Sequence, residues 1–182
     1  SWKSLGSDLP LSDTYSANAR CIREDPVRQG LLYLGTENAL HVSFNDGANW
    51  LPFQTNLPHT PVHWLVVQEH FNDLVIGTYG RGFWILDDIT PLQQLTPEVL
   101  QSDIYLFPPR PAYRFHSRTG PGSQRGDPCI GENPPYGASI NYYLKMGETA
   151  QIKISIQDGK GQTIRTLDGK KDRDINRVWW DL

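Results

Sequence analysis

The sequence predicts an all-β protein, and three observations support this fold class. Turn-forming residues are frequent and spread along the chain, with 16 Gly and 14 Pro among 182 residues. The segments between them are short and rich in aromatic and β-branched residues, which favour strands. The sequence also repeats itself at a spacing that suits units of a few strands each.

Two sequence blocks each occur twice, in the same order. Residues 2–10 and 50–58 both read W-x-x-(L/F)-x-(S/T)-(D/N)-L-P and lie 48 positions apart. Residues 32–36 (LYLGT) and 74–78 (LVIGT) lie 42 positions apart. A period of about 40–50 residues is typical of the blades of a β-propeller. We therefore interpret residues 1–95 as the end of one blade followed by two four-stranded antiparallel blades.

Each complete copy divides into four short strands. The first two strands of each copy are nearly continuous apolar runs, which predicts that both of their faces are covered by neighbouring blades. The predicted strands cover residues 19–24, 31–36, 40–44 and 50–55 in the first copy, and 62–68, 74–78, 82–86 and 92–95 in the second.

The turn between the last two strands of the first copy resembles the Asp-box, S-x-D-x-G-x-x-W. A serine hydroxyl and an acceptor two positions later can bond turn backbone groups, and glycine adopts a backbone conformation that a Cβ would penalise. A tryptophan then buries a large ring between strands. Asn45 stands where Asp is usual, but its amide oxygen can accept the same bonds. The residues of this structural Asp-box are Ser43, Asn45, Asp46, Gly47 and Trp50.

A calcium site at Asn45 and Asp46 is the alternative interpretation of this turn. Two oxygen side chains in a tight hairpin are too few ligands for calcium. The Asp-box therefore indicates architecture rather than activity.

Taken together, these stretches resemble the last blades of a bacterial, sortilin-like propeller protein with Asp-box (BNR) repeats. The resemblance rests on residues 24–26, 31–37 and 43–50, and above all on 72–92, NDLVIGTYGRGFWILDDITPL. It implies a large exported protein, which is secreted, periplasmic or at the cell surface. Known propellers have at least about four blades, so we expect this chain to be a fragment of such a protein or one part of an assembly.

The second half of the chain predicts a linker and then part of a β-sandwich. Residues 96–136 are rich in Pro and Gly and begin with a short helix that Thr96 caps and Pro97 starts. In residues 137–182, alternating isoleucines at 152–156 and a turn at 158–161 indicate strands joined by a hairpin. This region resembles an immunoglobulin-like sandwich of the flagellar-hook-capping type, with fewer strands than a complete one.

Arg81 and Trp84 are the residues that we single out as possible ligand contacts. They belong to a Gly-rich stretch, residues 77–82, which could be mistaken for a phosphate-binding loop. A strand follows it rather than the N-terminus of a helix, so we interpret it as a tight hairpin.

The remaining patterns have structural interpretations as well. Asp87 and Asp88 are neighbours on a predicted strand and point to opposite faces, so they cannot flank one glycosidic bond. The histidines at 59, 63 and 70 lack a metal-ligand pattern, and the tripeptide at 125–127 (RGD) occurs easily by chance. Cys21 and Cys129 are compatible with one disulfide or with two separate thiols.

The functional hypothesis is a non-catalytic extracellular binding or scaffold module. We assign no catalytic, cofactor-binding or metal-binding residue. The net charge of −3 argues against nucleic acid as a partner, and no apolar run is long enough to span a membrane. The expected partners are the remaining blades and a peptide, protein or glycan ligand. The alternatives are a sialidase-like glycoside hydrolase with its active site largely in other blades, and a structural subunit of an extracellular assembly.

Overall fold

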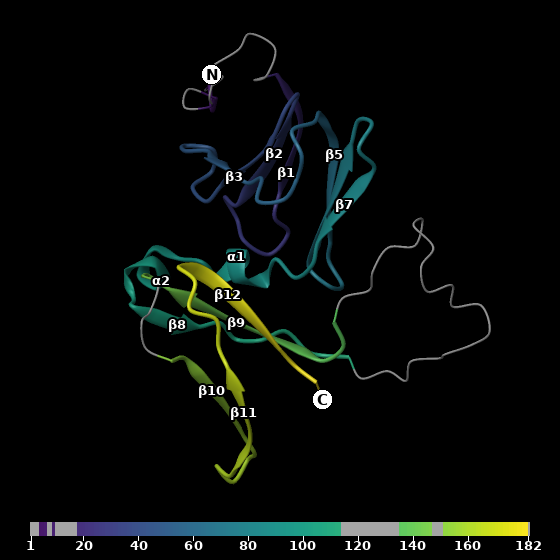
Figure 1. Cartoon of the computed structure of the whole chain (residues 1–182). Helices are drawn as coiled ribbons and strands as arrows, with labels where there is room; N and C mark the ends of the chain where they lie inside the picture. Colours follow the sequence, from purple (N-terminus) through teal and green to yellow (C-terminus); the bar gives the residue numbers. More distant parts are fainter. Residues whose placement is uncertain (1–3, 7–8, 10–17, 114–134, 147–150, 182) are drawn as a thin grey trace, which may run out of the picture. The chain divides into compact units, whose positions relative to one another are not determined.

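The computed structural model confirms an all-β protein with antiparallel sheets, none of which is closed. It describes residues 4–6, 9, 18–113, 135–146 and 151–181 (Figure 1). The chain divides into two compact units, Ser1–Gln94 and Leu95–Leu182. None of the helices in the described ranges is long and apolar enough to cross a membrane.

The first unit contains two antiparallel sheets that correspond to the two repeats. Strand order in both sheets follows the sequence, so each sheet is a simple meander. The four-stranded sheet consists of β1 (Ala19–Glu24), β2 (Leu32–Thr36), β3 (Leu40–Ser43) and β4 (Leu51–Pro52). The three-stranded sheet consists of β5 (Val62–Gln68), β6 (Asp73–Thr78) and β7 (Phe83–Leu86).

The predicted fourth strand of the second repeat, residues 92–95, was wrong, because the chain forms helix α1 (Thr90–Gln94) there. Pro91 suits the first turn of a helix, where its missing N–H costs nothing. The buried Asp88 accepts hydrogen bonds from the Thr90 N–H and hydroxyl, which fixes the helix start. The description as four-stranded blades therefore holds for the first sheet only.

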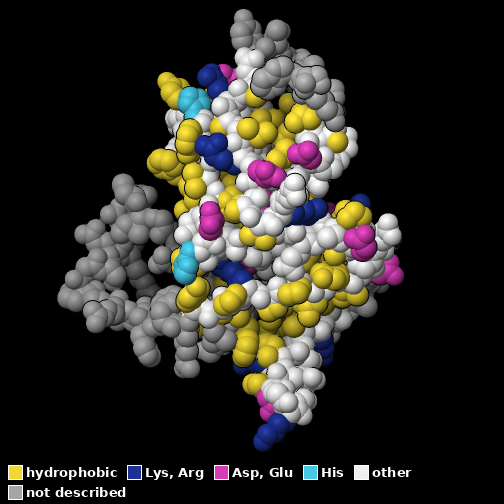
Figure 2. Space-filling model, turned by 180° about the vertical axis from the view of Figure 1, so that it is seen from behind, with side chains coloured by type: hydrophobic (Ala, Val, Ile, Leu, Met, Phe, Trp, Pro, Cys, Tyr) yellow, Lys and Arg dark blue, Asp and Glu magenta, His cyan; other side chains and the backbone are white. Residues whose placement is uncertain are grey.

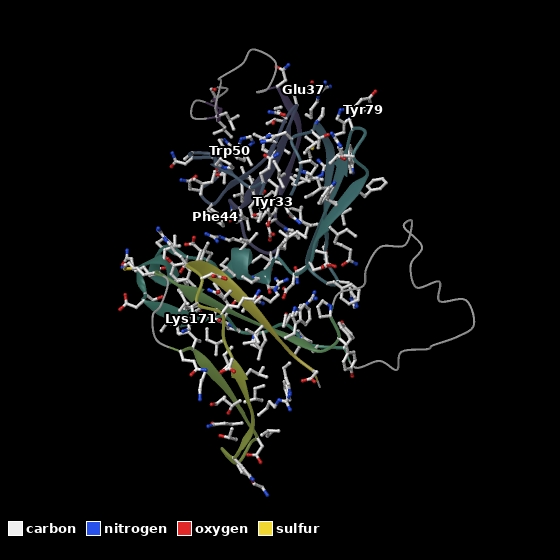
Figure 3. The ribbon with its side chains drawn as sticks, viewed as in Figure 1. Tyr33, Glu37, Phe44, Trp50, Tyr79 and Lys171 are labelled. Carbon is white, nitrogen blue, oxygen red and sulfur yellow. The ribbon has the colours of Figure 1, made fainter. Side chains whose placement is uncertain are left out.

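The two sheets pack face to face around the main core of the first unit. β2 is buried along its whole length, as its continuous apolar run predicted. Figure 3 shows Tyr33 between the two sheets and Trp50 on the opposite side of the first sheet. The core between the sheets contains Leu31, Tyr33, Leu40, Val42, Leu57, Val62, Leu65, Leu74, Ile76 and Ile89. A smaller cluster on the other face contains Leu32, Leu34 and Trp50, with Leu9 packed against it.

The repeat found in the sequence is also a structural repeat. The Leu57 N–H donates to the Gln54 carbonyl at 2.8 Å, and 48 positions earlier the Leu9 N–H donates to the Gly6 carbonyl at 3.3 Å. Leu57 belongs to the core between the sheets, whereas Leu9 packs on the far face of the first sheet. Leu9 thus packs on one face of the first sheet, and Leu57 contributes to its other face. Trp2 lies outside the described residues.

A buried carboxylate at the turn after β1 connects the ends of both sheets. Asp25 accepts hydrogen bonds from the backbone N–H groups of Val27 and Arg28, both at 2.9 Å, and from the Tyr33 hydroxyl at 3.2 Å. The Gln93 side-chain amide on α1 donates to both Asp25 oxygens at 3.2 Å. Burial and the neighbouring carboxylate raise the pKa of Tyr33, so its hydroxyl remains a donor.

Helix α1 is fixed to the first unit by further bonds from the same region. Gln93 also donates to the Asn72 side-chain oxygen at 3.1 Å, at the turn between β5 and β6. The Arg28 guanidinium donates to the Leu92 carbonyl at 2.7 Å. The helix is therefore held against the turns of both sheets, which explains why the chain leaves β7 without adding a strand to it.

The second unit contains a three-stranded sheet and a separate hairpin. The sheet has the order β12-β9-β8, and its core contains Val99, Phe107 and Tyr143. The hairpin pairs β10 with β11. The elements are α2 (Pro97–Gln101), β8 (Ile104–Leu106), β9 (Ala138–Leu144), β10 (Lys153–Gln157), β11 (Thr163–Asp168) and β12 (Asp174–Trp180).

Two sequence expectations for the second unit are confirmed, and one detail differs. Thr96 caps α2, with Pro97 at its start, and the 158–161 turn joins a hairpin. The difference is β8, which lies within the predicted linker of residues 96–136. It pairs with β9, and Phe107 donates a backbone hydrogen bond to Asn141 at 3.0 Å. Most of the predicted loop at 117–135 lies outside the described residues.

The buried His41 on β3 predicts a loss of stability at mildly acidic pH. Burial lowers its pKa, and its Nδ1 has no hydrogen-bond partner among the described residues. The unfolded chain, with a histidine pKa of about 6.5, binds a proton more readily than the folded chain. The stability that depends on neutral His41 is therefore fully present above about pH 6.5. It falls as the pH drops below this value, by at most about 1.4 kcal/mol per pH unit.

Urea unfolding at about pH 7.5 and 5.5 measures this effect, because the unperturbed histidine pKa lies between these values. We expect His41→Phe to reduce the stability difference between the two pH values. The exposed His70 provides the control, since His70→Gln should retain the difference. An unchanged pH dependence in His41→Phe would show that other groups cause it.

The hydrogen bonds to Asp25 predict that two substitutions, Asp25→Ala and Tyr33→Phe, lower the free energy of unfolding by different amounts. Asp25→Ala leaves several buried donors unsatisfied at once, so we expect a loss of about 2–4 kcal/mol in the free energy of unfolding. Tyr33→Phe removes a single donor and leaves the Gln93 contact intact, so we expect about 1 kcal/mol. Urea unfolding of the two variants tests the network, and equal losses would contradict its central position.

Candidate functional site

The Asp-box residues form a network of hydrogen bonds in the turn after β3. The Ser43 hydroxyl donates to the Asn45 side-chain oxygen at 3.0 Å and accepts the Gly47 N–H at 2.9 Å. Asn45 also accepts the Asn49 N–H at 2.9 Å. Its amide group donates to the Asn49 side-chain oxygen at 2.9 Å, which a carboxylate at this position could not do. The Asp46 N–H donates outside the turn, to the Gly30 carbonyl at 2.8 Å.

The rest of the box serves packing. Asp46 and Gly47 both have positive φ, 57° and 76°, so glycine at the second position relieves backbone strain. The buried Trp50 ring packs with Leu32 and Leu34, and its indole N–H donates to the Leu5 carbonyl at 2.7 Å. Trp50 of the Asp-box thus holds Leu5 by a hydrogen bond and belongs to the cluster on which Leu9 packs.

Arg81 and Trp84 lie at and beside the hairpin between β6 and β7. The Trp84 ring is half-buried against the main core, and its indole N–H donates to the Arg81 carbonyl at 3.0 Å. Arg81 itself is exposed. The inward side of β7 therefore holds the tryptophan, and of the two residues the exposed arginine is the one that a ligand could reach. Their role as ligand contacts stays a prediction.

The other polar candidates are separate from one another. His59 Nδ1 lies 3.3 Å from the Asn38 carbonyl oxygen, while His63 stacks on Tyr79 with ring centroids 5.6 Å apart. His70 packs edge-on against Phe71. No group of three or more His, Cys, Asp or Glu side chains in the described ranges could hold a metal ion.

The last candidates from the sequence are the two cysteines and the RGD tripeptide. Cys21 is a free thiol on β1, 3.4 Å from the Val62 carbonyl oxygen, and burial raises its pKa and so weakens it as a nucleophile. Cys129 and residues 125–127 lie outside the described residues.

The most prominent surface of the first unit is the outer face of the β5–β7 sheet. Strand register places Val66, Val75 and Ile85 in one row across the three strands, and Trp64, Gly77 and Phe83 in the next. The side chains of Phe83, Ile85 and Trp64 are 83%, 61% and 59% exposed. In Figure 2, hydrophobic side chains, in yellow, lie at the surface of this part of the molecule. We call these six residues the outer face.

The outer face corrects one expectation from the sequence. The nearly continuous apolar run of β5 predicted that both of its faces are covered, but its burial alternates and leaves Trp64 and Val66 exposed. The same alternation occurs in β7, where Phe83 and Ile85 are the exposed residues. A period-two pattern in these strands could have revealed the face, but apolar residues at the exposed positions concealed it.

Two aromatic rings of the outer face share one row, Trp64 on β5 and Phe83 on β7. The Arg23 guanidinium on β1 lies 4.6 Å from the centre of the Trp64 ring, within the range of a cation–π contact. Gly77 stands between Trp64 and Phe83 in its row, so the row consists of two aromatic rings around a position without a side chain. The face is therefore apolar and uneven, and it offers contact area rather than reacting groups.

In comparisons with known protein families, with curated proteins and with solved structures, this chain gives no match.

Proposed function

We propose that the chain is a non-catalytic binding or scaffold module, built from propeller-type blades of a larger exported, sortilin-like protein. The observation that carries the proposal is the outer face, a sheet surface made of apolar side chains with no covering layer among the described residues. Monomeric proteins seldom expose contiguous apolar patches of large area unless a partner covers them. The export and the sortilin-like relationship rest on sequence resemblance alone.

The packing within the first unit supports stacking as the role of this face. On the first sheet, the second sheet packs on one side, and Leu9 packs on the cluster of the other side. Among the described residues, the second sheet is covered on its inner side only. A further sheet packed on the outer face would give it the environment that the first sheet already has, and further blades of the same protein or of an assembly would supply it.

The chemistry of the described polar groups favours binding over catalysis. Asp25 is saturated with hydrogen bonds from neighbouring groups, and Asp88 accepts those that start α1. Burial lowers the pKa of His41 and raises that of Cys21, which leaves the first uncharged and the second a poor nucleophile. These groups serve the fold, whereas the exposed groups of the outer face are aromatic and aliphatic.

Substitution of Phe83 tests whether the outer face is a contact surface. Because the side chain is 83% exposed, Phe83→Lys should change the free energy of unfolding by no more than about 0.5 kcal/mol. It should nevertheless lower the binding of a hydrophobic fluorescent dye, since it places a charge within the patch.

Val27→Lys is the matched control for this experiment. Val27 is also exposed, at 67%, but it lies in the turn after β1, away from the rows of the outer face. Dye binding that is equal in both variants would contradict the assignment of the outer face as the contact surface. A large loss of stability in Phe83→Lys would mean that the residue belongs to the core.

A further inference from the structure

Gly77, on the central strand of the outer face, is a glycine that the contacts of the described residues do not require. Its φ is not positive, so its backbone conformation is open to residues with a side chain. A Cβ at this position would meet the Trp64 Cβ at 3.4 Å and the Phe83 Cε1 at 3.6 Å, which are ordinary van der Waals contacts. A glycine inside a strand weakens the strand, and it often marks a place where a ligand or another backbone approaches closely.

Gly35 shows what lies on the equivalent position of the first sheet. It pairs with Cys21 on β1 and with Leu40 on β3, so it has the place in the first sheet that Gly77 has in the second. A Cβ on Gly35 would lie 2.6 Å from the Val62 Cγ1 and 2.7 Å from the Val62 carbonyl oxygen, too close for any side chain. Glycine is therefore required there, because the backbone at the start of β5 lies on it.

The outer face continues the interface that the two sheets already form. The side of the first sheet that packs on β5–β7 presents Tyr33, Leu40 and Val42, and the strand register places Val75, Phe83 and Ile85 at the same positions of the outer face. Where the first sheet has Cys21 beside its glycine, the second has the larger Trp64. We call the surface over Gly77, between the Trp64 and Phe83 rings, the Gly77 site.

Two arginines give the surroundings of the Gly77 site a positive charge. The Arg23 guanidinium lies 4.6 Å from the centre of the Trp64 ring, and Arg81 lies in the turn between β6 and β7. Neither arginine forms an ion pair with a described residue. The six residues of the outer face carry no charge themselves. A partner with an apolar residue for the site and an acidic residue beside it complements both features.

We propose that the Gly77 site binds an extended segment of a separate polypeptide, which lies on the glycine as the start of β5 lies on the first sheet. The segment carries a β-branched residue, like Val62, over Gly77 and an acidic residue next to it. A separate polypeptide is the source, because in every copy of this chain Val62 is already buried against the first sheet. The inference rests on the proposed function, because it takes the outer face as a contact surface.

Alanine at each of the two glycines tests whether Gly77 serves a partner rather than the fold. Gly35→Ala should lower the midpoint of thermal unfolding by about 5 °C or more, because the new Cβ overlaps Val62. Gly77→Ala should leave the midpoint unchanged or raise it slightly, since alanine suits a strand better than glycine does. A midpoint that falls equally in both variants would show that the fold itself requires Gly77, and it would overturn the inference.

A synthetic peptide of residues 58–63 is the probe for the Gly77 site, because it contains Val62 in its own sequence context. In the peptide, His63→Glu supplies the acidic residue, and His63→Gln is the uncharged control of the same size. NMR titration of the isotope-labelled full chain with up to about 2 mM peptide measures binding. We expect the Gly77 and Phe83 amide signals to shift.

The expected affinities rank the variants. Gly77→Ala should bind the acidic peptide at least about tenfold more weakly than the wild type, because its methyl group occupies the site. The uncharged control peptide should bind the wild type about threefold more weakly than the acidic one, as for one exposed ion pair.

The outcomes separate this inference from the proposed function. No shift at Gly77 at the highest peptide concentration would overturn the inference, as would equal binding by the wild type and Gly77→Ala. Self-association of the chain alone, seen in sedimentation velocity and abolished by Gly77→Ala, would also overturn it, because a second copy would then occupy the site. If Phe83→Lys lowers dye binding while Gly77→Ala binds the peptide normally, the proposed function stands and the inference falls.

Discussion

The structure of the first unit depends on covering the apolar faces of its sheets. A sheet with apolar residues on both sides is stable in water only when another layer lies on each of them. The first sheet meets this condition, and its strand β2 is buried throughout. The second sheet meets it on one side, where Leu65, Leu74 and Ile76 enter the common core. The outer face is the side of this sheet on which no layer lies among the described residues.

The buried Asp25 explains why a helix, rather than a further strand, follows β7. Asp25 gathers donors from its own turn and from Tyr33, and through Gln93 it holds α1 against the ends of the strands. Buried carboxylates with several donors are expensive to disturb, so the helix is a fixed part of the unit. Because the chain turns into α1 after Asp88, it does not extend the second sheet, and β7 is an edge strand of that sheet among the described residues.

Much of the first unit could be predicted from the sequence. The strands at 19–24 and 62–68 have the predicted bounds, and the repeat spacing correctly placed β2 and β6 at equivalent positions. Local patterns sufficed there, because apolar runs and turn residues act over a few positions. The Pro97 helix and the hairpin at 158–161 were predictable for the same reason.

The failures have a common physical origin in contacts between distant residues. Residues 92–95 were predicted as a strand by analogy with the first repeat, but a helix forms there. Asp88 accepts a hydrogen bond from the Thr90 N–H, and Asp25, 68 positions before Gln93, accepts one from the Gln93 side chain. The exposed positions of β5 could not be recognised, because Trp64 and Val66 are as apolar as their buried neighbours. Whether a layer covers them depends on what lies beyond the strand, and neither periodicity nor composition encodes this.

Among the described residues, β7 pairs with β6 alone. The exchange of individual backbone amide hydrogens, measured by NMR, tests most directly whether the other side of β7 is unpaired. In dilute solution we expect the Trp84 and Leu86 amides to be protected by β6, and those of Phe83 and Ile85 to exchange rapidly. Slow exchange of Phe83 and Ile85 in dilute, monomeric chain would contradict the open edge, because it would mean that the chain already covers it.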